Sequence, residues 1–324
     1  MKILIAIVLI SLSTVTYTQD YSTDSFADSA CTDTLNLKLI PKEEAANLLR
    51  LEDDMSRQWN HFDIIARLKG KEGSREDLLE FAARQTRDWT EEEKSFLDKS
   101  RDTINCIIRK KRLHLSYPKE ICMLKTTMLE EDGAGGYTRG NYIVLINKIT
   151  TAPQSLVNQL VAHESFHILT RSNPEFRKQM YSLIGFHILP REVEFPQELR
   201  ERIITNPDVI RHDSYATFTI NGKKTDCIMV TCTVKPYEGG KVLKYMQTRL
   251  VAIDRINCKA LEKDGKAVTY CIDDAGDFYD KVGRNTNYTS DPEEILADNF
   301  SYLLTNKQEL ESPHIIRKME TICR

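Results

Sequence analysis

The chain of 324 residues has no apolar run of the roughly twenty residues that a membrane-spanning helix needs. It also has no internal repeat and no low-complexity tract, so repeat arrays and fibrous folds are excluded. Lysines and arginines are interspersed with acidic residues and the formal net charge is −3, so we expect no nucleic-acid partner and no stable membrane insertion. The chain has no Cys-x-x-Cys pair, which argues against a zinc site built from thiolates.

The first eighteen residues have the layout of a secretory signal peptide. Lys2 precedes an apolar run from Ile3 to Ile10, and small polar residues follow before Asp20. We therefore expect residues 1–18 to be removed by cleavage near Thr18. The mature protein should then be secreted, either to the extracellular space or to a periplasm.

The eight cysteines all lie beyond this segment. An even number of cysteines in an exported chain predicts disulfide bonds, although the sequence leaves nearly all the possible pairings open. A bond between Cys227 and Cys232 is disfavoured, because residues five apart on a strand point to opposite faces. Buried, reduced cysteines are the alternative.

The pattern of predicted elements indicates an α+β fold in four parts after the signal peptide. Residues 19–115 form an N-terminal helical region with three amphipathic helices, the last of which begins at Thr90 with a capping box to Glu93. Residues 116–190 should form a central core, and the segments that we expect there are a strand at 121–129, a flexible glycine-rich loop at 133–140, a strand at 141–147 and a helix at 154–169.

The second half of the chain is β-rich before it returns to helix. Residues 191–290 form an inserted β-rich subdomain, with hairpin turns at Asn221-Gly222 and near Asp264-Gly265. Residues 291–324 form a C-terminal helix. Asp291 suits its N-cap and Pro292 suits its first turn.

One five-residue stretch carries the strongest chemical signal. Residues 163–167 read His-Glu-Ser-Phe-His. On a helix this spacing turns His163 and His167 to one face, where they can share a zinc ion while Glu164 reaches a water molecule beside it. The surrounding helix is apolar on nearly all faces and should be buried, where histidines need a partner such as a metal. The alternative is a surface helix with two unrelated histidines at a chance spacing.

A second pair of residues four apart can supply a third ligand. A catalytic zinc commonly takes three protein ligands and leaves the fourth position to water. In the C-terminal helix, Glu294 and Asp298 share a face. Glu294 can supply a carboxylate ligand, and Asp298 can accept a hydrogen bond from the outer nitrogen of a ligating histidine. The alternative is that both are ordinary solvated acids near a helix start.

Together these residues resemble the gluzincins, the thermolysin-like clan of zinc metallopeptidases, in which His-Glu-x-x-His on one helix is completed by Glu-x-x-x-Asp on a later one. The resemblance implies His163, His167 and Glu294 as zinc ligands, Glu164 as the catalytic carboxylate, and Asp298 as the partner of a ligating histidine. It also implies a zincin-like core, made of a mixed sheet, an active-site helix and a ligand helix, and a peptide or protein substrate.

Two features depart from the family pattern. Glu293 stands where thermolysin-like enzymes usually have Asn, and it could compete with Glu294 for the ligand role. We favour Glu294, because only Glu294 pairs with Asp298 at a helical spacing of four. The interval between His167 and Glu294 is also longer than in compact members of the clan. We expect the inserted β-rich subdomain to fill this interval and to overhang the cleft.

The sequence thus predicts a secreted zinc-dependent metallopeptidase, in which a zinc-activated water attacks the peptide bond and Glu164 acts as general base. Tyr288, close in sequence to Glu294, is the first candidate for stabilising the oxyanion, followed by His212 and Tyr215. Two other functions stay open. One is a non-catalytic secreted binding module with a structural metal or none, and the other is a zinc amidase acting on a non-protein, cell-wall amide.

Overall fold

The computed structural model describes residues 31–324, so the predicted signal peptide lies outside the described residues. These residues form a mixed α+β fold with more than one sheet, as the sequence predicts. The helices are α1 (Lys42–Leu49), α2 (Asp54–Arg57), α3 (His61–Arg67), α4 (Arg75–Ala83), α5 (Glu91–Lys111), α6 (Gln154–Ser172), α7 (Pro174–Leu183), α8 (Gln197–Arg200), α9 (Phe278–Val282), α10 (Pro292–Leu304) and α11 (Pro313–Ile322). The strands are β1 (Leu37–Leu39), β2 (Ile121–Thr126), β3 (Gly136–Arg139), β4 (Tyr142–Ile146), β5 (His187–Ile188), β6 (Ser214–Ile220), β7 (Lys223–Thr233), β8 (Met246–Asp254), β9 (Lys259–Ala260), β10 (Glu262–Lys263), β11 (Lys266–Ala267) and β12 (Thr269–Tyr270).

The first sheet has the strand order β1-β2-β4-β3. Strands β1, β2 and β4 are parallel, and β3 pairs antiparallel with β4 at the edge. Side chains alternate between the two faces of the sheet. On β4, Ile143 and Leu145 join the core that contains α5 and α6, whereas Val144 joins the core under α1 and α4. Helices therefore cover both faces of this sheet.

Two predictions for the first half of the chain are wrong in detail. The N-terminal region has five helices, α1 to α5, rather than three, because several short turns divide it. The predicted loop at 133–140 contains strand β3, whose four residues are all buried. Its glycines suggest a loop in the sequence, but Gly136 is packed so closely that an added Cβ would lie 2.9 Å from Leu145. The capping box from Thr90 to Glu93 is confirmed at the start of α5.

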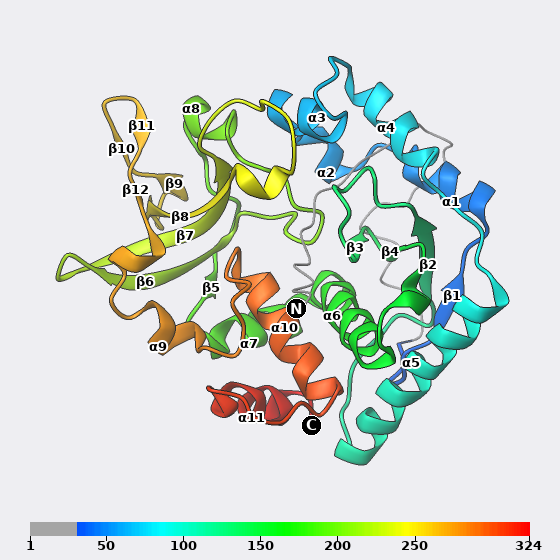
Figure 1. Cartoon of the computed structure of the whole chain (residues 1–324). Helices are drawn as coiled ribbons and strands as arrows, with labels where there is room; N and C mark the ends of the chain where they lie inside the picture. Colours follow the sequence, from blue (N-terminus) through cyan, green and yellow to red (C-terminus); the bar gives the residue numbers. More distant parts are fainter. Residues whose placement is uncertain (1–30) are drawn as a thin grey trace.

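Helices α6 and α10 lie between the two large sheets (Figure 1). They pack against each other, and α6 also contacts the edge strand β3. The end of the chain forms two helices, α10 and α11, where the sequence predicts one. Asp291 and Pro292 begin α10 as predicted. Within residues 31–324, every helix is too short or too polar to cross a membrane.

The second sheet has the order β12-β8-β7-β6-β5, and β9 pairs with β8. It begins at β5, a few residues before the predicted boundary at residue 191. Both predicted hairpin turns are confirmed. Asn221 and Gly222 join β6 to β7 with φ angles of 49° and 75°, and Asp264 and Gly265 join β10 to β11 with φ angles of 53° and 73°. Two successive positive φ angles are typical of the tight turn that matches the twist of a hairpin.

The cysteines are distributed over both halves of the fold. Seven carry free thiols, and these are Cys106, Cys122, Cys227, Cys232, Cys258, Cys271 and Cys323. The structure therefore does not contain the disulfides that the cysteine count predicts among them. Several of these cysteines pack as small apolar side chains, the alternative that the sequence left open.

The N-terminus of α5 is joined to β2 by a buried ion pair, which generates a stability prediction. The Lys125 Nζ atom lies 2.5 Å from Glu93 Oε2, and both side chains are nearly inaccessible to solvent. Replacing Lys125 with Met leaves a buried carboxylate without its cation, so we expect a loss of about 3 kcal/mol in the free energy of unfolding. Urea-induced unfolding measures this loss in the free energy of unfolding. As a control, Lys94→Met removes an exposed pair with Glu91 and should cost less than about 1 kcal/mol; equal losses in the two variants would contradict the prediction.

Candidate metal site

Helix α6 carries the first half of the site. It runs for 19 residues without Gly or Pro from the residue after Pro153 to Ser172, and Asn173 and Pro174 follow it. His163, Glu164 and His167 each have 0% of their surface exposed. The prediction of a buried helix is confirmed, and the alternative of a surface helix is excluded.

Helix α10 carries the second half of the site. Its N-cap, Asp291, accepts a hydrogen bond of 2.8 Å from the backbone N–H of Glu293, and Pro292 occupies the first turn. All thirteen residues of the helix are buried. The acids near its start are therefore not solvated surface charges, because Glu294 is fully buried and Asp298 is nearly so.

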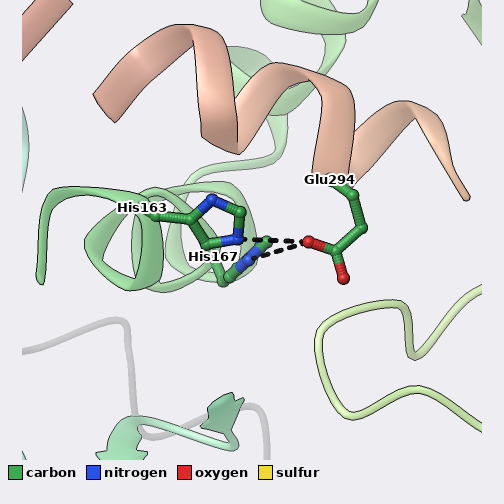
Figure 2. A group of neighbouring side chains, drawn as sticks. All are labelled: His163, His167 and Glu294. Carbon is green, nitrogen blue, oxygen red and sulfur yellow. Dashed lines mark hydrogen bonds and ion pairs between the residues drawn. The ribbon is translucent and has the colours of Figure 1, made fainter. Parts of the chain in front are cut away.

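Three side chains from the two helices converge on one point. Figure 2 shows His163 and His167 on α6 facing Glu294 on α10. Glu294 Oε2 lies 3.1 Å from His163 Nε2 and 3.7 Å from His167 Nε2. Zinc bonds to such atoms are about 2.0–2.1 Å long, so tetrahedral ligand atoms are roughly 3.3 Å apart. The spacing fits three ligands around one small cation.

Each histidine is oriented by a second carboxylate on α10. His163 Nδ1 lies 3.0 Å from Asp298 Oδ1, and His167 Nδ1 lies 3.0 Å from Glu293 Oε1. Asp298 also accepts a hydrogen bond from Thr286. Because each Nδ1 is engaged, each Nε2 is directed at the common point. Glu293 is thus positioned as the partner of His167 rather than as a competitor of Glu294.

Both orienting carboxylates are held in their ionised forms. Burial alone would raise the pKa of Asp298, but the hydrogen bond and charge of His163 keep that pKa below its ordinary value. Burial opposes ionisation of Glu293 in the same way, but the hydrogen bond and charge of His167, the charge of Arg177 and the hydrogen bond from Thr170 together outweigh burial and lower the Glu293 pKa. Glu293 also accepts hydrogen bonds from Tyr181 Oη at 2.6 Å and Thr170 Oγ1 at 2.5 Å. Acceptor-only carboxylates fix the tautomer of the rings.

The two oxygens of Glu294 have different surroundings. Oε2 faces the histidines, whereas Oε1 accepts a hydrogen bond of 2.6 Å from Asn206 Nδ2 and one of 3.2 Å from Tyr288 Oη. The sequence singled out Tyr288, and the structure brings it into the site as a donor to Glu294. Asn206 was missed, because nothing in its sequence surroundings connects it with α10.

Glu164 lies beside the cluster and against the edge strand. Its Oε2 accepts a hydrogen bond of 2.8 Å from Thr138 Oγ1. Its Oε1, like His167 Nε2, is buried without a hydrogen-bond partner among the described residues. Burial raises the pKa of Glu164, although the charges of His163 and His167 oppose that rise. Buried polar atoms are rarely left unpaired, so these two atoms in one cluster are available to a cation or a donor.

The electrostatics of the cluster favour a cation. Burial would lower the pKa of His163, yet the hydrogen bonds with Asp298 and Glu294 raise it well above its ordinary value. Asp208, which the sequence analysis did not identify, lies 3.8 Å from His167 Nε2. Burial raises the pKa of Asp208 well above its usual range, and the charges of Glu164 and Glu294 raise it further. The crowding of buried acids, together with the donor spacing, means that the cluster could hold a metal ion.

Two other candidate residues lie outside the cluster. The His212 ring packs against Phe195 with centroids 5.4 Å apart, and burial lowers the pKa of His212 to about 4. The Tyr215 ring contacts His187 across strands β5 and β6, with centroids 5.5 Å apart. The ring of each residue therefore packs against another ring, Phe195 for His212 and His187 for Tyr215, outside the group formed by His163, His167 and Glu294.

Comparison with known proteins adds no relative to this picture. No family model, no curated protein and no solved structure matches the chain. The resemblance to gluzincins therefore rests on the residues of the two motifs.

The contact between Asp298 and His163 generates a prediction for metal binding. Asp298→Ala removes the acceptor that orients His163, so we expect the affinity for a divalent metal to fall by about 10–100-fold. Competition with a chromogenic chelator measures the affinity. Asp280→Ala, which changes an exposed acid on α9, is the matched control and should leave the affinity unchanged. Equal affinities in all three proteins would show that Asp298 does not support the site.

Proposed function

We propose that this protein is a secreted zinc-dependent metallopeptidase of the gluzincin type. The observation that carries the proposal is the convergence of His163, His167 and Glu294 from two buried helices, with Glu164 beside them. Two imidazoles and one carboxylate are a donor set that catalytic zinc sites use. The zincin-like core is part of the proposal, supported by an antiparallel edge strand that contacts the histidine-bearing helix.

Zinc bound by these three ligands would polarise the scissile carbonyl and lower the pKa of a water molecule at its fourth position. The protein groups supply orientation and proton transfer. Asp298 and Glu293 hold the two rings with Nε2 inward. Asn206 and Tyr288 hold Glu294 with Oε2 inward. The first coordination sphere is thus preorganised before any substrate arrives.

Glu164 is the proposed general base. Thr138 engages one of its oxygens, and the other oxygen is free to take a proton from the attacking water and deliver it to the leaving amine. Its raised pKa suits a group that must both accept and release a proton near neutral pH. The Thr138 contact fixes the carboxylate at the edge of the first sheet.

The surroundings of the cluster support a peptide as substrate. In the described residues, β3 has β4 on one side only and is the edge of its sheet. An extended peptide can add to such an edge by backbone hydrogen bonds. A cavity of about 1150 Å³ reaches the same region and is lined in part by Arg139, Thr170 and Glu293. Secretion is proposed on the layout of residues 1–18 alone.

The decisive test is Glu164→Gln. We expect hydrolysis of denatured protein or peptide libraries to fall by at least about a hundredfold, because the general base is lost. Zinc stoichiometry should stay near one, because Glu164 is not a proposed ligand. Mass spectrometry of the native protein measures the metal and a fluorogenic peptide library measures hydrolysis. Glu43→Gln, at an exposed position of α1, is the control. A variant that keeps full activity would exclude the assignment.

A further inference from the structure

The segment of residues 205–210 crosses the proposed active site and touches both halves of it. Asn206 donates to Glu294 on α10. Asp208 Oδ1 accepts a hydrogen bond of 2.7 Å from the backbone N–H of Thr138 on the edge strand. The segment therefore occupies the backbone donor to which an added peptide strand would bond.

One of the two carboxylate oxygens of Asp208 is unpaired among the described residues. The side chain is fully buried, and Oδ2 has no hydrogen-bond partner within the described residues. Ligand atoms of Asp208, His167 and Glu164 all lie within 4.8 Å of one another. An unsatisfied buried carboxylate oxygen costs free energy unless a cation or a donor meets it. The unpaired Nε2 of His167 is 3.8 Å from the other oxygen of Asp208.

We propose that Asp208 is a fourth protein ligand of the metal, so that the folded protein is a latent enzyme. The proposal rests on the function proposed above. Zinc sites with four protein ligands are closed and structural, whereas catalytic sites keep one position for water. Withdrawal of the Asp208 carboxylate would free that position for a water molecule, with no covalent bond made or broken.

The cavity beside the site supports this assignment. Asp208 lines the cavity, but His163, His167 and Glu294 do not, and each of the three has 0% of its surface exposed. Asp208 and its segment therefore stand between the cavity and the metal donors. A substrate in the cavity reaches the donors only after the segment moves.

The segment is anchored at Thr205 and at Pro207, by residues of two different helices. On one side, Asp63 of α3 accepts hydrogen bonds from the backbone N–H and the hydroxyl of Thr205, and Arg67 donates to the Thr205 carbonyl oxygen. On the other side, Arg171 of α6 donates to the carbonyl oxygen of Pro207. Asp63 and Arg67 are buried and form their own ion pair. The N-terminal helices thus hold the closing segment in place, and displacement of α3 is a route to opening.

The test uses the full-length, zinc-loaded protein and its Asp208→Ala variant. Acetohydroxamate, a small chelator that needs an open zinc position, is titrated by calorimetry. We expect the variant to bind it about 10–100-fold more tightly than the wild type, because the wild type is mostly closed. In the cobalt-substituted proteins, the visible absorption bands should change with loss of the carboxylate ligand. Peptidase kcat/KM should rise in parallel.

Two further variants make the result interpretable. Asp208→Asn keeps the shape and the Thr138 hydrogen bond but loses the charge, so it should bind acetohydroxamate more tightly than the wild type even if Asp208→Ala fails to fold. Asp273→Asn changes an exposed acid and should match the wild type. Unchanged chelator affinity and cobalt spectrum in the Asp208 variants, with zinc bound and Glu164→Gln inactive, would overturn this inference and leave the peptidase assignment standing. Absence of bound zinc in the wild type would instead refute the proposed function.

Discussion

The burial of several ionisable groups in one place is the constraint on which the rest of the structure depends. His163, Glu164, His167 and Glu294 have no solvent exposure, and Asp208 is nearly as inaccessible. Each would be costly to desolvate alone. The fold meets this cost by pairing every group with a partner of fixed geometry. Helices α6 and α10 must therefore pack in one register, because a shift of one residue would remove the contacts of His163 and His167 with α10.

These pairings also give chemically similar acids different roles. Glu293, Glu294 and Asp298 lie within two turns of one helix, yet their oxygens serve different partners. Glu293 and Asp298 engage Nδ1 atoms, and Glu294 faces the Nε2 atoms. Neighbouring hydroxyls determine this division, since Tyr181 and Thr286 occupy the remaining oxygens of the orienting acids. The ligand role thus falls to Glu294, the acid whose Oε2 lies near both Nε2 atoms.

Local spacing made part of the site predictable, and long-range contacts made the rest unpredictable. The residues four apart on α6 and α10 could be predicted because helical periodicity alone puts them on one face. The role of Glu293 depends on Tyr181 and on the rotation of α10, which no spacing reveals. Strand β3 was missed because its glycine-rich surroundings suggest a loop, although close packing requires Gly136 there. Asp208 was missed because a loop residue reaches the site only through the fold. His212 was proposed as an oxyanion-stabilising residue from its residue type, but its ring packs against a phenylalanine.

Charge balance relates the proposed closed site to the proposed active one, because both use the same donors. A divalent ion held by neutral imidazoles of His163 and His167 and by the carboxylates of Glu294 and Asp208 would form a set with no net charge. Without the Asp208 carboxylate, the same ion and its three remaining protein ligands would carry a net positive charge, which would acidify a water molecule at the freed position. Glu164, whose Oε1 is buried without a hydrogen-bond partner among the described residues, would be the base that receives the proton. In the proposed latent enzyme, the position of one buried carboxylate would therefore distinguish a structural centre from a reactive one.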